Sequence, residues 1–125
     1  MFKQRSVVMK SYLAVFLGKP EAMETWKKLP EAKRKEREQA GMAAWHKWVA
    51  DHKDAITEMG TPLGKTKRAD KNGITDTRNE LGAWTVVKAN SQDEAAKLFL
   101  NHPHFTIFPG DRVEVMECLP IPTIQ

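Results

Sequence analysis

Two histidines flank a proline near the end of the chain, in the segment His102-Pro103-His104. Imidazole is the side chain that most often transfers protons in catalysis, because its ordinary pKa lies close to neutral pH. In an extended segment, side chains two residues apart point to the same side, so both rings would face one ligand. A helix is expected to end at His102, and the negative end of its dipole favours a protonated imidazole. We therefore predict an acid–base site with His102 as proton donor or acceptor and with His104 and Asp111 beside it. The alternative is that His102 caps the last carbonyls of the helix and that His104 lies on the surface.

Four further side chains are candidates for binding the substrate of such a site: Trp45, His52, Lys65 and Phe105. Aromatic rings supply a large contact area for an apolar or aromatic ligand, and a lysine can pair with a ligand carboxylate. The simpler alternative places Trp45 in the core and makes His52 a neutral histidine on the apolar stripe of a helix. A metal site needs three or more convergent ligands, and no segment resembles a phosphate-binding loop. We expect neither a metal nor a cofactor.

The composition predicts a small protein with one domain. The chain has 125 residues, 41% of them hydrophobic, which is enough for one modest core. We place the domain at residues 9–125, after a flexible extension of residues 1–8. The formal net charge is +4, but basic and acidic residues are interleaved, which argues against nucleic acid as a partner. No apolar run approaches the roughly 20 residues of a membrane span. The single cysteine, Cys118, expected to be buried in a strand, favours a reducing compartment, the cytoplasm.

The pattern of apolar residues, prolines and glycines predicts the elements that position these residues. They are a strand at 10–17, a short helix starting at Pro20, a long helix from Glu31 to Met59, strands at 62–69 and 74–89, a helix after Ser91 and a last strand within 111–118. Gly60 is expected to end the long helix, and Asn72-Gly73 to form a tight antiparallel turn. Ser91 and Glu94 have the spacing of a capping box.

This order of elements is that of the split βαβ arrangement, so we predict a ferredoxin-like α+β fold with an antiparallel sheet. Two helices would cover one face of the sheet. The strand at 10–17 carries apolar residues on both faces, which would leave the second face exposed and apolar. Packing of two such faces predicts a homodimer with a two-fold axis.

The order of these segments and their characteristic residues resemble the YCII-related family, including its DGPF branch. The resemblance rests on an opening strand after Met9, a Trp-bearing helix followed by Gly60, Gly82-Ala83-Trp84 leading a strand, and Pro103 before a closing Val-Glu-Val. It covers most of residues 9–122. The family implies a dimeric α+β barrel with a cleft between helices and sheet, and acid–base chemistry of the lyase or elimination type without a cofactor.

The chain departs from the family pattern at three points. The supposed active site of the family has an aspartate before the proline that follows the second helix, where this chain has His102. It also has a histidine on the first helix, and counting back from Gly60 reaches Val49 instead. The DGPF motif is incomplete, because Asp76 is followed by Thr, Arg and Asn at 77–79. These departures place the chain in a divergent branch.

We therefore expect a small cytoplasmic enzyme-like protein that binds an oxygenated or aromatic metabolite in a cleft between helices and sheet, and that uses histidine acid–base chemistry. The partners expected are a small-molecule ligand and a second copy of the chain, without nucleic acid or membrane. The alternative is a non-catalytic ligand- or partner-binding accessory domain, which the missing aspartate favours. Only the enzyme needs two titrations in a bell-shaped pH–rate profile.

Overall fold

The computed structural model describes residues 9–123 and shows the predicted ferredoxin-like α+β fold. The main sheet is antiparallel and has the strand order β2-β5-β1-β6. The elements are β1 (Lys10–Leu17), α1 (Pro20–Lys27), α2 (Glu31–Asp51), β2 (Ile56–Glu58), β3 (Thr66–Asp70), β4 (Gly73–Thr77), β5 (Leu81–Ala89), α3 (Gln92–Lys97), α4 (Pro103–Thr106) and β6 (Arg112–Glu117). The predicted flexible extension at residues 1–8 lies outside the described residues.

Strand β1 lies in the middle of the sheet because its side chains are apolar on both faces. It pairs antiparallel with β5 on one side and with β6 on the other. Tyr12, Ala14 and Phe16 alternate on the face that packs against the helices, and they are 2%, 0% and 2% exposed. Trp48 of α2 and Phe99, which follows α3, belong to the same buried cluster. The core is thus formed between one sheet face and these two segments.

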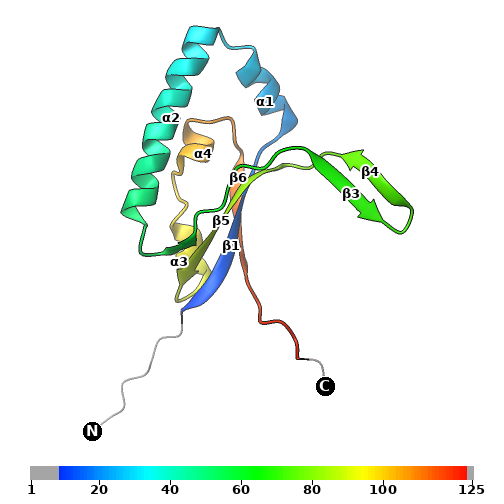
Figure 1. The fold of residues 1–125 in the computed structure, drawn as a ribbon. Helices are drawn as coiled ribbons and strands as arrows, with labels where there is room; N and C mark the ends of the chain where they lie inside the picture. Colours follow the sequence, from blue (N-terminus) through cyan, green and yellow to red (C-terminus); the bar gives the residue numbers. More distant parts are fainter. Residues whose placement is uncertain (1–8, 124–125) are drawn as a thin grey trace.

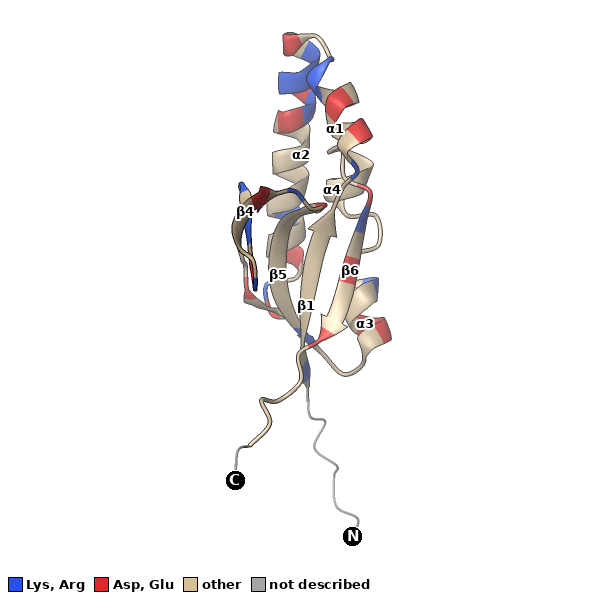
Figure 2. Cartoon of the chain, turned by 90° about the vertical axis from the view of Figure 1, so that its right-hand side faces the viewer, with Lys and Arg blue, Asp and Glu red and all other residues tan. Residues whose placement is uncertain are grey.

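The helices lie on one side of the sheet and leave its other face uncovered (Figure 1). Figure 2 shows this second face, with β5, β1 and β6 in front and α2 and α4 behind them. By register, Leu13 of β1, Val86 of β5 and Met116 of β6 lie side by side on it. Met116 is 42% exposed. The predicted open, partly apolar sheet face is therefore present.

Helix α2 ends at Asp51, and its predicted continuation to Met59 is wrong. Residues 56–58 instead form β2 at the edge of β5. The backbone N–H of Lys88 donates to the carbonyl of Ala55, and the Thr57 hydroxyl donates to the carbonyl of Val86. Hydrogen bonds to an open strand edge thus take precedence over the helical periodicity of the segment. Met59, the last residue of the predicted helix, is 65% exposed.

Strands β3 and β4 form a hairpin separate from the main sheet, because β2 already occupies the edge of β5. Antiparallel pairing is as predicted, but Asp70 pairs with Gly73, so Lys71 and Asn72 are the turn residues. Gly73 has a φ of 117°, which favours glycine. The strand predicted at 74–89 is divided into β4 and β5. Figure 1 shows the hairpin projecting away from the helices.

Ser91 caps α3 as predicted, with its hydroxyl accepting the backbone N–H of Glu94 at 3.1 Å. The helix ends at Lys97 rather than near His102, and Pro103 begins a further short helix, α4, where a loop was expected. Proline is suited to the first position of a helix. His102 is consequently the N-cap of α4 and not the last residue of a helix.

No helix within residues 9–123 combines the length and apolar character needed to cross a membrane. Cys118 follows β6 and is exposed, which corrects the expectation that it is buried.

Candidate functional site

A cavity of about 960 Å³ lies between the helices and one end of the sheet. This volume is in the range of pockets that hold small molecules. Residues of α1 and α2, the adjoining ends of β1 and β5, and the loop after α4 form its walls. Its lining is rich in aromatic side chains: Phe16, Trp45, Trp48, Trp84 and Phe108. The cavity is therefore suited to a ligand with an apolar body.

The ring of Phe108 lines the cavity by packing directly against Gly41, in the middle of α2. A Cβ atom at Gly41 would lie 2.5 Å from the Phe108 ring, so only glycine lets the ring approach the helix so closely. The centroids of Phe108 and Trp45 are 6.0 Å apart, with the rings inclined at 64°. Sequence reasoning missed Phe108; the signal was Gly41 itself, since glycine inside a helix costs about 1 kcal/mol relative to alanine.

His104 lines the cavity, and its ring is held by a backbone group. Its Nε2 lies 2.8 Å from the carbonyl oxygen of Leu17, the last residue of β1. A carbonyl accepts hydrogen bonds only, so Nε2 carries the proton and Nδ1 keeps a free lone pair. Within residues 9–123, only the Nε2 atom of His102 is a fully buried side-chain nitrogen or oxygen without a hydrogen-bond partner. The Nδ1 atom of His104 has no partner either, and because it is not fully buried it is accessible.

The environment of His104 favours its neutral form. Burial lowers the pKa of its imidazole, while the hydrogen bond to Leu17 and the charge of Asp111 act in the opposite direction. A neutral imidazole with an open nitrogen is a proton acceptor at neutral pH.

Gly110 packs directly against the His104 ring. Its backbone N–H donates to the carbonyl of His104 at 2.9 Å, and a Cβ atom on it would collide with both the imidazole and this carbonyl. The backbone N–H of the next residue, Asp111, donates to the same Leu17 carbonyl that His104 contacts, at 2.9 Å. The loop after α4 is thereby joined to the end of β1.

His102 is buried among aromatic rings and is 0% exposed. Its Nδ1 accepts the backbone N–H of His104 at 3.0 Å, and its Nε2 has no hydrogen-bond partner within residues 9–123. The ring centroids of Trp45, Trp48 and Phe16 lie 4.5, 4.7 and 5.0 Å from its own. Burial, with smaller contributions from the other histidines, lowers its pKa to about 3.

The expectation of a protonated His102 at a helix C-terminus is therefore wrong. The imidazole is neutral because an aromatic enclosure cannot solvate a charge. The planes of the His102 and Trp45 rings are inclined at 89°, an edge-to-face arrangement of the two aromatic rings. His102 is not in the lining of the cavity, so its ring supports the wall formed by Trp45 and Trp48 from behind.

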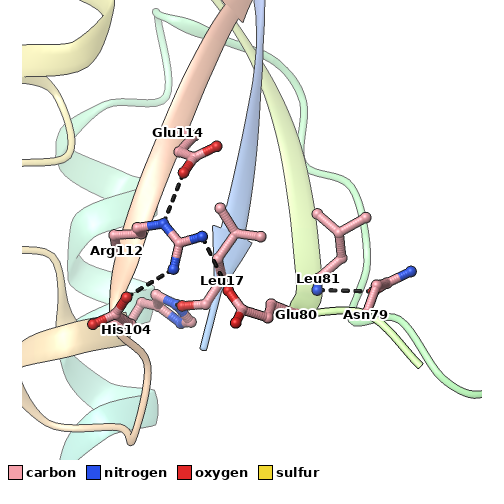
Figure 3. Close-up of polar contacts among 8 residues, drawn as sticks. Leu17, Asn79, Glu80, Leu81, His104, Arg112 and Glu114 are labelled. Carbon is pink, nitrogen blue, oxygen red and sulfur yellow. Dashed lines mark hydrogen bonds and ion pairs between the residues drawn. The ribbon is translucent and has the colours of Figure 1, made fainter. Parts of the chain in front are cut away.

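Asp111 belongs to a charged cluster beside the cavity rather than to its wall. The Arg112 guanidinium contacts carboxylates of Asp111, Glu114 and Glu80 at 2.7, 2.7 and 3.0 Å (Figure 3). The three carboxylates raise the pKa of Arg112 above its ordinary value. The pair between Arg112 and Glu80 connects β6 to the residue before β5, next to the His104 ring.

Three of the predicted binding residues do not line the main cavity, whereas Trp45 does. His52 caps the end of α2, with Nδ1 2.8 Å from the carbonyl oxygen of Trp48. Phe105 lies on α4 outside the lining, and Lys65 lines a second, smaller cavity at the base of the hairpin. Among residues 9–123 no group of three or more His, Cys, Asp or Glu side chains is arranged to hold a metal ion.

No family model and no curated protein matches the sequence. Among solved structures, the chain is similar to 5-chloro-2-hydroxyhydroquinone dehydrochlorinase from Burkholderia phenoliruptrix AC1100, in its complex with 2,5-dihydroxybenzoquinone. The two share 18% sequence identity with a TM-score of 0.49, over 84% of this chain and 89% of that one. Similarity at this level does not transfer the ligand or the reaction. The YCII-related resemblance stays a prediction from the sequence.

Proposed function

We propose that the protein binds a small molecule with an apolar, aromatic-sized body in the main cavity, and that His104 removes a proton from it as general base. The observation that carries this proposal is the orientation of the His104 ring. The ring of His104 lines the cavity, the Leu17 carbonyl holds its protonated Nε2, and its Nδ1 keeps a free lone pair. A base fixed in one tautomer inside an apolar pocket is suited to eliminations and isomerisations that begin with loss of a proton.

His104 replaces His102 as the proposed proton-transferring residue. A general base works only above its own pKa, and burial lowers the pKa of His104. Activity should therefore persist to a lower pH than an ordinary histidine would allow. Asp111 counteracts part of that shift through its charge and does not itself touch the cavity.

The proposal can be tested by deuterium exchange, which detects proton removal without knowledge of the full reaction. Aryl-substituted cyclic ketones and lactones are incubated with the protein in D₂O, and loss of the signal of the proton next to the carbonyl is followed by NMR. Replacing His104 with glutamine retains an amide N–H for Leu17 but removes the basic nitrogen. We expect H104Q to lower the exchange rate by about 100-fold or more.

The matched control is H52Q, because His52 lies outside the cavity lining and should leave exchange unchanged. Thermal denaturation of both variants checks that they fold. Exchange by H104Q at the wild-type rate would contradict the proposed role of His104.

The second candidate is ligand binding without turnover. It is favoured by the way the His104 ring is oriented: a backbone carbonyl holds it, and within residues 9–123 no carboxylate hydrogen bonds to it. If ligands quench the tryptophan fluorescence of the protein but no exchange occurs with any carbon acid, this candidate replaces the first.

We also propose that two copies pack through the open sheet face, in a reducing cytoplasmic setting consistent with the one free cysteine. Met116 on this face is 42% exposed, and Arg112 and Glu114 lie on the same face by register. Light scattering at micromolar concentration should give twice the mass of the chain. Replacing Met116 with lysine should shift the mass toward the monomer, and a wild-type monomer would refute the dimer.

A further inference from the structure

The main cavity adjoins a second cavity of about 640 Å³ at the base of the β3–β4 hairpin. Arg78, Asn79 and Leu81 line both cavities. The remaining lining of the second cavity is largely polar or charged: Gly64, Lys65, Thr66, Lys67, Asp76 and Thr77. An apolar pocket and a polar pocket thus meet at a shared wall that contains an arginine.

Two basic side chains at this junction have no ion-pair partner within the described residues. Asp76 is the one carboxylate in the lining of the second cavity, and Lys67 already pairs with it at 2.6 Å. Within residues 9–123 neither Arg78 nor Lys65 forms an ion pair. Asn79 uses its side-chain oxygen to accept the backbone N–H of Leu81, which leaves its NH₂ group free to donate. Two positive charges and an amide donor therefore remain for a ligand.

The junction lies at the same end of the sheet as His104. The backbone N–H of Gly18 donates to the carbonyl of Glu80, and Leu81 is paired with Leu17 in the sheet. The carbonyl of Leu17 is in turn the partner of the His104 ring. Arg78 stands two residues before Glu80, which lies at a bend, so the Cα atoms of the two residues are separated by at most about 7 Å. One ligand can therefore span from Arg78 to the base.

We infer that the ligand is an aromatic acid, with its ring in the main cavity and its carboxylate bound by Arg78, assisted by Lys65 and Asn79. The inference rests on the proposed function of the main cavity and adds the chemical class of its ligand. A planar guanidinium matches the two oxygens of a carboxylate, and the aromatic lining matches a ring. This arrangement also sets the ring between an anchoring cation and the Nδ1 atom of His104.

The test compares two isosteric probes, 2-naphthoate and 2-naphthamide, by quenching of tryptophan fluorescence, since Trp45 and Trp84 line the main cavity. Both probes have the same ring, and only the first carries a charge. We expect the wild type to bind the acid about tenfold more tightly than the amide. In R78Q this preference should vanish because acid binding weakens, while amide binding stays at the wild-type value. R78K should recover part of the preference.

The matched control is K71Q, which removes a positive charge from the hairpin turn, outside the lining of both cavities. It should behave like the wild type, and circular dichroism melts check that each variant folds. Equal affinity of the wild type for acid and amide would overturn the inference and leave the proposed function standing. Failure of both probes to quench at millimolar concentration would contradict both. Tighter binding of 2-naphthyl phosphate than of the carboxylate would overturn the assignment of a carboxylic acid.

Discussion

The buried imidazole of His102 makes folding stability depend on pH in a way that can be calculated. Its pKa is about 3 in the folded protein and 6.5 in an unconstrained chain, so between these values the unfolded state binds a proton that the folded state does not. The contribution is therefore fully present above pH 6.5 and is lost as the pH falls toward 3. Between pH 7 and pH 5 the loss is about 2 kcal/mol.

Urea denaturation at these two pH values measures the effect. With an m value of roughly 1.5 kcal/mol per molar urea, a loss of about 2 kcal/mol lowers the midpoint by roughly 1.3 M. The informative variant is H102N, because asparagine also caps a helix N-terminus but does not titrate. It should be less stable at both pH values, since the aromatic enclosure loses part of its filling. Its stability difference between pH 7 and pH 5 should be about 2 kcal/mol smaller than that of the wild type.

The control for this comparison is H46N, which makes the same substitution at an exposed position of α2. The readout is a difference between two pH values within each variant, so the packing cost of the substitution cancels. An unchanged pH dependence in H102N would refute the conclusion that His102 is neutral and enclosed in the folded protein.

Two further substitutions test other parts of the structure. G110A places a methyl group against the imidazole and carbonyl of His104. The free energy of unfolding, measured by thermal or urea denaturation, should fall by about 1–3 kcal/mol, and deuterium exchange should slow. A variant with full stability and full exchange would contradict the proposed contact between Gly110 and the His104 ring. S91A removes the hydroxyl that accepts the backbone N–H of Glu94, and its urea midpoint should report a loss of about 1 kcal/mol without a change in ligand binding. An S91A protein as stable as the wild type would argue against the cap.

Gly60 illustrates a prediction that was half correct. It was expected in the conformation that ends a helix, and its φ is indeed positive, at 70°. It follows a strand, however, and a Cβ atom on it would collide with the carbonyl of Trp84. The glycine is thus required by contact with β5, a strand more than twenty residues away along the chain, which local sequence rules do not include.

The sequence by itself determined those features that depend on neighbours a few residues apart. The alternation in β1, the Ser91 cap, the antiparallel hairpin of β3 and β4 and the resulting ferredoxin-like order all follow from local backbone preferences and side-chain periodicity. Tertiary structure alone decided which residues surround the cavity. His102 and His104 are nearly adjacent in sequence, yet one is sealed among aromatic rings and the other faces the cavity, because Trp45, Phe16 and Leu17 arrive from distant segments. Solvation and hydrogen bonding at a titratable group depend on everything packed around it, so its chemistry becomes defined only when those segments meet.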